Sequence, residues 1–195
     1  MPPGTTNTRI VPLIEKVSGK TAGRDFGIVM QPEFLRQAVA EADFDRPWVI
    51  LIGADDQKAG DMVEELYRPF HAPIERLTIE EAEAQKYCHN LYNAVKIAFF
   101  NELRAICKKE GWDSDKIFQA VAQSCEGIWN PIYGLRDFGP FGGACLPKDT
   151  QGFYDWGTKK GHALGILGAV IEQNKRYADL LTEIKSRIEN LRERA

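Results

Sequence analysis

The stretch TIEEAEAQKYCHNLYNAVKIAFFNELRAICKKEG, residues 78–111, is the feature that most limits the folds open to this chain of 195 residues. It begins with a capping box formed by Thr78 and Glu81, keeps apolar residues at helical spacing, and stops at Gly111. The pattern predicts one helix of about 30 residues, which is long for a globular domain. We therefore expect it to be a central or interface element.

Before this helix, strand and helix patterns alternate. The apolar runs FGIVM (26–30) and WVILIG (48–53) predict buried strands of a parallel sheet, and PIERLT (73–78) predicts a further short strand. Helical spacing is found in three places: residues 6–17, the stretch after Pro32, and the stretch after a cap at Asp55 or Asp56. Residues 1–78 thus predict an α/β part, but they contain no G-x-G-x-x-G dinucleotide fingerprint.

After Gly111 the sequence is expected to be helical apart from one irregular segment. A helix over 115–124 is capped by Asp113 or Ser114, and the aromatic and glycine-rich segment 126–144 follows it. KDTQGFYDWGTKKG predicts another helix, and a last one is expected from His162 to the end. The last helix has an apolar face that needs a partner, made of Leu180, Leu181, Ile184, Ile188 and Leu191.

Charge and cysteine usage exclude several classes of function. The net charge of −3 shows no basic excess of the kind that binds nucleic acid. The four cysteines form no C-x-x-C pair and no histidine stands at ligand spacing, so a structural metal site is not expected. No secretory signal and no run of about 18 apolar residues is found, so we expect a cytoplasmic protein with free thiols and no membrane span.

One cysteine stands out by its neighbours. In FGPFGGACLPKDTQGF (138–153), Cys145 follows Gly142 and Gly143 and precedes Pro147. Proline suits the first position of a helix, so Cys145 is expected just outside the positive end of that helix. A thiol in such a place tends toward the nucleophilic thiolate. The alternative is a half-buried cysteine in a turn, which for an isolated cysteine is the commoner case.

Four segments together resemble the UDP-glucose/GDP-mannose dehydrogenase family. They are PPGTT (2–6), PEFLRQ (32–37), KYCHNLYNAVKIAFFNEL (86–103) and PFGGACLPKDT (140–150), in the family's order and approximate spacing. The GGACLPKD portion is the most specific. The resemblance implies an NAD-dependent enzyme that oxidises the C6 hydroxymethyl of a UDP- or GDP-sugar to a carboxylate. The reaction would pass through a thiohemiacetal and a thioester on a cysteine.

The resemblance also implies catalytic roles for particular residues. Cys145 would be the nucleophile, Lys86 and Asn90 would stabilise the oxyanion, and Asp149 would orient water or assist proton transfer. Glu33 would be the base for thioester hydrolysis. From the residues alone, Lys86 and Asn90 also fit a solvated helix face, while Asp149 and Glu33 fit acidic residues in a first helical turn.

Binding residues follow from the same resemblance. The sugar nucleotide would contact Phe34, Leu35, Arg36, Tyr133, Phe141 and Gly142. Lys148 would contact NAD, with a surface lysine as the alternative. Arg136 is either a substrate-facing or an exposed arginine, and Gln37 departs from a glutamate found in many relatives.

The expected fold is mainly α with an N-terminal α/β part. The resemblance implies three regions: the C-terminal half of an NAD-binding domain (1–78), a central helical dimerisation domain (79–160) and a long connecting helix (161–195). We expect a homodimer, truncated at both ends relative to the family and inactive alone because half of the cofactor site is missing. The alternatives are a non-catalytic dimerisation or scaffold module, and an unrelated cysteine hydrolase with His89 or His162 as its base.

Overall fold

The computed structural model describes residues 1–135 and 139–192, with side chains through Glu189. The chain divides into two compact units, the first spanning Met1–Asn93 and the second beginning at Ala94. The described residues are mainly helical and include one small parallel sheet, as expected for the fold class. None of the helices among them is long and apolar enough to cross a membrane.

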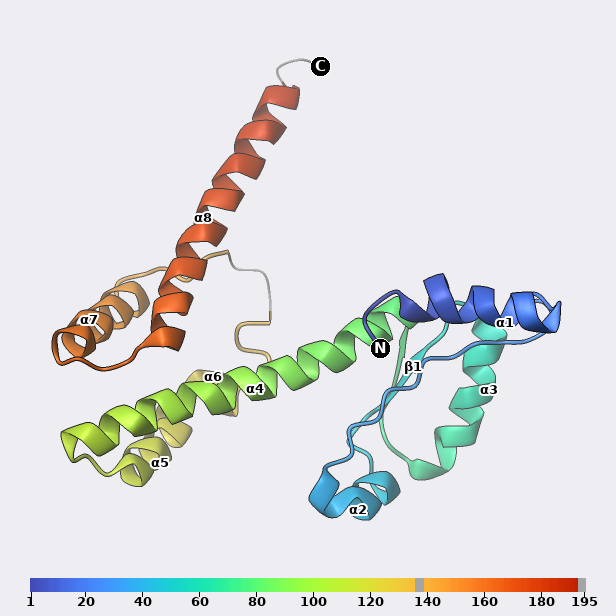
Figure 1. Cartoon of the computed structure of the whole chain (residues 1–195), viewed down its shortest axis with the longest axis horizontal. Helices are drawn as coiled ribbons and strands as arrows, with labels where there is room; N and C mark the ends of the chain where they lie inside the picture. The colour runs from blue at the N-terminus through green and yellow to red at the C-terminus, as the bar shows by residue number, and fades with distance from the viewer. Residues whose placement is uncertain (136–138, 193–195) are drawn as a thin grey trace. The chain divides into compact units, whose positions relative to one another are not determined.

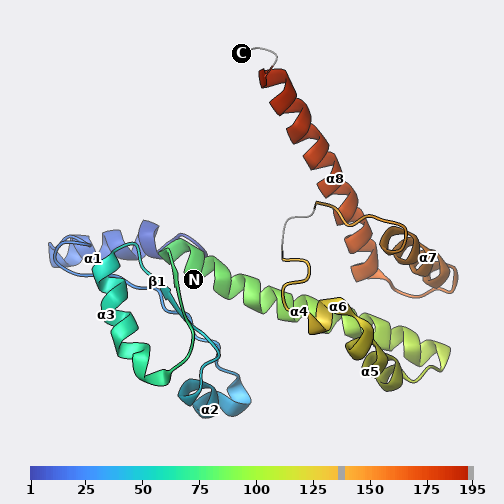
Figure 2. The ribbon, with the colours of Figure 1, turned by 180° about the vertical axis from the view of Figure 1, so that it is seen from behind.

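The sheet of the first unit has two parallel strands, β1 (Ile50–Gly53) and β2 (Ile74–Leu77). Helix α3 (Gln57–Tyr67) and the short helix η3 (Arg68–Phe70) connect them, and α3 lies alongside β1 in both views (Figures 1 and 2). The side chain of Asp56 caps α3 by accepting the backbone N–H groups of its first turn. All of β1 is buried, which confirms the prediction of a buried parallel strand followed by a capped helix.

The strand expected at 26–30 is not formed, and that prediction was wrong. Met30 alone pairs with the sheet, where its N–H and C=O exchange hydrogen bonds of 2.8 and 2.9 Å with Gly53 in an isolated antiparallel bridge. Gly27 instead lies against α3, so close that an added Cβ would be 2.5 Å from the Cβ of Ala59. The apolar run is therefore held by contact with a helix and by isolated bridges at its two ends, Phe26 with Ala22 and Met30 with Gly53, rather than by a continuous ladder.

The helix after Pro32 begins later than expected. Residues 31–36 lie outside helices, and a 3-10 turn η2 (Gln37–Val39) leads into α2 (Ala40–Asp45). The reason is that two side-chain carboxylates accept hydrogen bonds from backbone N–H groups in this stretch. Glu33 accepts the N–H of Leu35 at 2.7 Å, and Asp43 accepts the N–H of Arg36 at 2.9 Å. Side-chain acceptors of this kind compete with the helical pattern.

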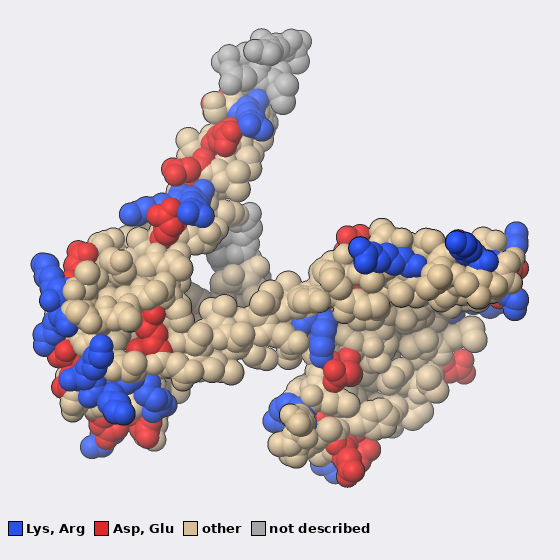
Figure 3. Space-filling view, viewed as in Figure 1, with Lys and Arg blue, Asp and Glu red and all other residues tan. Residues whose placement is uncertain are grey.

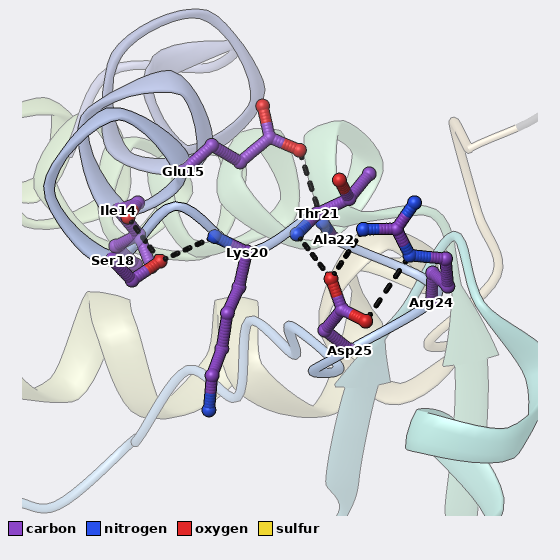
Figure 4. Close-up of polar contacts among 8 residues, drawn as sticks. All are labelled: Ile14, Glu15, Ser18, Lys20, Thr21, Ala22, Arg24 and Asp25. Carbon is purple, nitrogen blue, oxygen red and sulfur yellow. Dashed lines mark hydrogen bonds and ion pairs between the residues drawn. The ribbon is translucent and has the colours of Figure 1, made fainter.

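The N-terminal helical stretch was predicted correctly. A π-helical turn, η1 (Thr6–Ile10), continues into α1 (Val11–Ser18), which ends at Gly19 with a left-handed φ of 68°. Glu15 of α1 accepts the N–H of Ala22, and beyond the helix Asp25 accepts the N–H of Thr21 and pairs with Arg24 (Figure 4). These contacts reverse the chain direction after α1.

The long helix α4 (Ile79–Glu110) confirms the strongest prediction. Thr78 and Glu81 form the expected capping box with reciprocal hydrogen bonds of 2.9 to 3.2 Å, and Gly111 closes the helix with a φ of 74°. Ile79 and Ala82 are buried in the first unit, whereas Ile106 and Cys107 are buried in the second. One helix thus supplies core residues to both units.

In the second unit, α5 (Ser114–Ser124) is capped by Asp113, as expected, and Phe118 of α5 packs on Phe100 of α4 with ring centroids 5.0 Å apart. A single helical turn, α6 (Glu126–Trp129), falls in the segment expected to be irregular. Helix α7 (Leu146–Lys159) lies against the first part of α8 in both views (Figures 1 and 2).

The last helix, α8 (Gly165–Arg192), begins three residues later than predicted. Glu102 of α4 supplies its N-terminal cap by accepting the N–H groups of Ile166 and Leu167 at 2.8 and 3.2 Å. Acidic and basic side chains are interspersed along α8 (Figure 3), some in i,i+4 pairs such as Glu172 with Arg176. Its charged face is therefore stabilised locally.

Candidate functional site

In the first unit, Lys86 of α4 joins the segment that carries Glu33. The Lys86 ammonium donates to the backbone carbonyl oxygen of Glu33 and forms an ion pair of 3.3 Å with its carboxylate. The backbone N–H of Leu35, with help from Lys86, holds the pKa of Glu33 below that of an ordinary glutamate. Asn90 lies one turn further along α4 and is exposed. The structure therefore brings two of the predicted catalytic residues, Glu33 and Lys86, into contact.

Aromatic groups surround this contact. The ring of Phe34 lies 4.8 Å from that of His89, and the Lys86 ammonium is 4.9 Å from the Phe34 ring centroid. Beside it, a pocket of about 160 Å³ is lined mainly by apolar residues between Gln31 and Ile50, together with Tyr67 and Phe70. The predicted substrate residues Phe34 and Leu35 form part of this lining.

Arg36, also predicted to contact the substrate, is held by Asp43. Its guanidinium donates two hydrogen bonds of 2.7 and 2.9 Å to the Asp43 carboxylate and lies 4.7 Å from the ring centroid of Trp48. Asp43 is buried. The Arg36 guanidinium and backbone N–H lower the pKa of Asp43 to about 2. The pair fixes the start of α2 and leaves the backbone of Arg36 near the pocket.

The depressed pKa of Asp43 predicts a loss of stability in acid. The ionised form binds Arg36, so its contribution is complete above the ordinary aspartate pKa of 3.8 and is lost as pH falls toward about 2. Urea unfolding of the wild type and of Asp43→Asn should therefore differ at pH 6 and converge as the pH is lowered through this window. An equal difference at all pH values would show that the ion pair does not stabilise the fold.

In the second unit, Cys145 occupies the N-cap position of α7, as predicted. Pro147 lies in the first turn of the helix, and Asp149 donates its backbone N–H to the Cys145 carbonyl oxygen at 2.8 Å. Cys145 is exposed, as are Cys88 and Cys125, whereas Cys107 is buried. The preceding Gly143 has a φ of 80°, a conformation that favours glycine. An accessible thiol at a helix N-terminus is thus a feature of the structure.

Asn174 of α8 holds the loop before the cysteine, and this role was not predicted. Its side-chain oxygen accepts the N–H of Phe141 at 2.7 Å, and its amide group donates to the Phe141 carbonyl oxygen at 3.0 Å. Both backbone groups of a predicted substrate residue are therefore bound by one side chain. The sequence offered no local signal, because 33 residues separate the two partners.

The remaining predicted residues of the second unit lie on its surface. Lys148 and Asp149 form an ion pair of 3.4 Å, and both side chains are more than two-thirds exposed. Gly142 and Tyr133 are also exposed, and Tyr133 closes a turn with Asn130. Arg136 lies outside the described residues. Among the described residues no group of acidic, histidine or cysteine side chains could hold a metal ion.

His162, one candidate base for a cysteine hydrolase, is engaged elsewhere. Its Nε2 lies 2.8 Å from the Glu110 carboxylate, and only 2% of its side chain is exposed. Lys160, and then His162, lower the pKa of Glu110. The other candidate, His89, contacts Asn93 and the Phe34 ring. A buried imidazole bound to a carboxylate is poorly placed to deprotonate an exposed thiol.

Two family models match the chain. The model described as the UDP-glucose/GDP-mannose dehydrogenase family, NAD binding domain, matches residues 1–71, and that of the same family's central domain matches residues 80–176. Among curated proteins, GDP-mannose 6-dehydrogenase of Pseudomonas aeruginosa is 38% identical over 189 residues, 95% of this chain and 43% of the relative. A UDP-glucose 6-dehydrogenase of Haloferax volcanii is 35% identical, over 93% of this chain and 44% of the relative.

Solved structures give the same result. The crystal structure of a ternary complex of GDP-mannose dehydrogenase from Pseudomonas aeruginosa superposes with a TM-score of 0.87 at 38% identity, covering 94% of this chain and 43% of that one. A UDP-glucose dehydrogenase from Pyrobaculum islandicum gives a TM-score of 0.61 at 34% identity, covering 95% and 42%. The chain therefore spans less than half the length of these relatives.

Proposed function

Because the chain belongs to the UDP-glucose/GDP-mannose dehydrogenase family, we propose that it supplies the thiol chemistry of a sugar-nucleotide 6-dehydrogenase. The substrate would be a UDP- or GDP-sugar whose C6 hydroxymethyl is oxidised to a carboxylate. The higher identity to the Pseudomonas GDP-mannose 6-dehydrogenase favours GDP-mannose. The observation that carries the proposal is the exposed Cys145 at the N-terminus of α7, inside the segment matched by the central-domain model.

The proposed roles use groups whose surroundings suit them. The Cys145 thiol would add to the C6 aldehyde, and Asp149, on the first turn of the same helix, would orient water for hydrolysis of the thioester. Lys86 would stabilise negative charge on the sugar oxygen, with Asn90 as a neutral donor. Glu33, kept ionised by Leu35 and Lys86, would act as the base.

NAD would accept the hydride in both oxidation steps when bound. The described residues include two kinds of feature that could bind such a dinucleotide. These are two parallel strands with a crossover helix, and the exposed Lys148. The sequence has no glycine-rich turn of the G-x-G-x-x-G type to cradle a pyrophosphate. The residues present therefore do not by themselves make a complete NAD site, and the roles above concern only the sugar and the thiol.

Homodimer formation is proposed from two unpaired apolar stripes. Tyr87, Leu91 and Val95 follow one another at i,i+4 spacing on α4 and are all exposed, and Leu180, Ile184 and Ile188 do the same on α8. Burial of such stripes against a second copy would remove apolar area from water. Sedimentation equilibrium of the purified chain would test this, since a monomer at micromolar concentration would contradict it. The same stripes fit the alternative of a non-catalytic dimerisation module.

Protection of Cys145 from alkylation by a bound sugar nucleotide would distinguish the proposed dehydrogenase function from a non-catalytic dimerisation module. We expect GDP-mannose to slow the reaction of Cys145 with iodoacetamide severalfold in the purified chain, because bound ligand covers the thiol, and UDP-glucose to protect less well. Peptide mass spectrometry measures each cysteine separately, so the exposed Cys125 is the internal control. A scaffold module would show equal rates at Cys145 with and without either sugar nucleotide.

A further inference from the structure

Glu83, on the second turn of α4, is a buried carboxylate with no role in the functions described above. Its side chain is fully buried and is one of the largest fully buried side chains among the described residues. Its Oε2 accepts the backbone N–H of Gly4 at 2.6 Å, and its Oε1 accepts both the N–H and the hydroxyl of Thr6, at 3.0 and 2.6 Å. An ionised group at such a depth requires strong hydrogen bonds, and these three donors provide them.

The turn that receives this carboxylate cannot satisfy the same groups itself. Gly4 has a φ of 82°, which lets the backbone N–H groups of Gly4 and Thr6 face the same acceptor. The internal bonds of the turn use other atoms: Thr5 donates to the Pro2 carbonyl at 3.1 Å, and Thr8 donates to that of Gly4 at 3.0 Å. Without Glu83, two N–H groups and the nearly buried Thr6 hydroxyl would lose their acceptor.

Packing fixes Glu83 relative to the sheet. Ala82 lies so close to Gly53, the last residue of β1, that a Cβ on Gly53 would be 2.4 Å from its methyl group. Asn7, just after the turn, donates to Asp55 at 2.8 Å, and Asp55 accepts the N–H of Ile79 at 3.1 Å. The turn is thus fastened at the carboxyl end of β1, the edge at which parallel sheets bind nucleotides.

The same part of α4 also holds the second loop of the site. Glu83 and Lys86 are three residues apart, so their side chains emerge from neighbouring turns on one face. Glu83 binds the turn at Gly4 and Thr6, while Lys86 binds the backbone of Glu33. Two loops from distant parts of the sequence are therefore held by two residues of α4 that lie about one turn apart on the same face.

We propose that Glu83 is a positioning residue, whose buried carboxylate holds the Gly4–Thr6 turn at the nucleotide-binding edge beside Lys86. Burial raises the pKa of Glu83, but the hydrogen bonds from Thr6 and Gly4 outweigh this and keep it below that of an ordinary glutamate. The carboxylate is therefore ionised at neutral pH and accepts from all three donors. The proposal rests on the proposed function for its ligand, a sugar nucleotide or NAD.

The test compares Glu83→Gln with one matched variant in the full chain. Glutamine keeps the shape but turns one acceptor into an N–H donor, which meets a donor on the turn. Glu65→Gln removes the same charge from an exposed position on α3 of the same unit. Backbone amide exchange followed by NMR reports on the turn, and calorimetric titration with GDP-mannose and with NAD reports on the site.

We expect Glu83→Gln to speed amide exchange at Gly4 and Thr6 by about tenfold or more, with the amides of β1 unchanged, and to weaken binding of the ligand. Glu65→Gln should change neither measurement. Unaltered exchange would overturn the proposal, and so would faster exchange with unaltered ligand affinity, which would make Glu83 purely structural. A wild-type chain that binds neither ligand would contradict the proposed function, and amide exchange would then decide whether Glu83 holds the turn.

Discussion

Replacement of Gly53 by alanine is expected to destabilise the first unit by about 1 to 3 kcal/mol, the range for overpacking a close contact. The new Cβ would lie 2.4 Å from the Cβ of Ala82, 2.9 Å from the Thr78 carbonyl oxygen and 3.1 Å from that of Met30. None of these neighbours is the end of a flexible side chain. Relief would require α4 to move away from β1, and with it Glu83 and Lys86.

Equilibrium unfolding in urea measures this effect, with Gly152→Ala as the control. Gly152 lies inside α7, and nothing lies within 4 Å of its added Cβ. Alanine there should therefore be neutral or stabilise by about 0.5 to 1 kcal/mol, the helix propensity difference. Equal midpoints for Gly53→Ala and the wild type would show that α4 does not pack on β1 as closely as described.

Strong local sequence signals were sufficient to predict helices α4 and α3. The long helix α4 was predicted to within a residue or two because its capping box and its terminal glycine are both local in sequence. Helix α3 was predicted for the same reason with a cap at Asp55 or Asp56, and the structure shows that Asp56 is the cap. Such features depend on residues within one turn, and hydrogen bonds of this range form wherever the chain is helical.

Errors arose where distant contacts decide the conformation. The run at 26–30 has strand composition, yet Gly27 packs on Ala59 and only Met30 reaches the sheet. The apolar composition of the run indicates that it is buried, but it does not indicate against what. A helix can bury an apolar run as well as a sheet can. The late start of α2 depends on Asp43 capturing the N–H of Arg36 from seven residues away. No local pattern predicts that competition.

In the candidate site too, the locally determined features were predicted, and those that depend on distant contacts were missed. Cys145 could be placed from Gly143 and Pro147 alone, because a turn and a helix start are local features. Asn174 and Glu83 were missed, although each binds backbone groups of a segment that the sequence had singled out. For Glu83 a weak signal existed, since it shares the buried stripe of α4 with Ile79 and Ala82. A glutamate in an apolar stripe predicts a buried partner, but its identity comes only from the fold.

Capture of an aldehyde by Cys145 is the most direct expected consequence of the proposed function. The C6 aldehyde of GDP-mannose should form a reversible adduct with the purified chain, visible by native mass spectrometry. The thiol adds to the carbonyl carbon, so a C–S bond forms, the carbonyl π bond breaks, and the thiol proton ends on the oxygen. The step needs no oxidant, so it can be observed without NAD. GDP-mannose itself carries no aldehyde and should give no adduct.

Cys145→Ala should abolish this adduct, because the nucleophile is gone, the buried Cys107 is shielded from solvent, and the exposed Cys88 and Cys125 lie outside the N-terminus of α7. Cys125→Ala is the matched control, since it removes another exposed thiol of the same unit and should leave the adduct unchanged. A difference between the exposed thiols would reflect their positions, because Cys145 precedes the fourteen-residue helix α7 whereas Cys125 precedes only the single turn α6. An adduct that survives in Cys145→Ala, or that forms equally on Cys88 and Cys125, would mean that the accessibility of a thiol and not its place in this site governs the reaction.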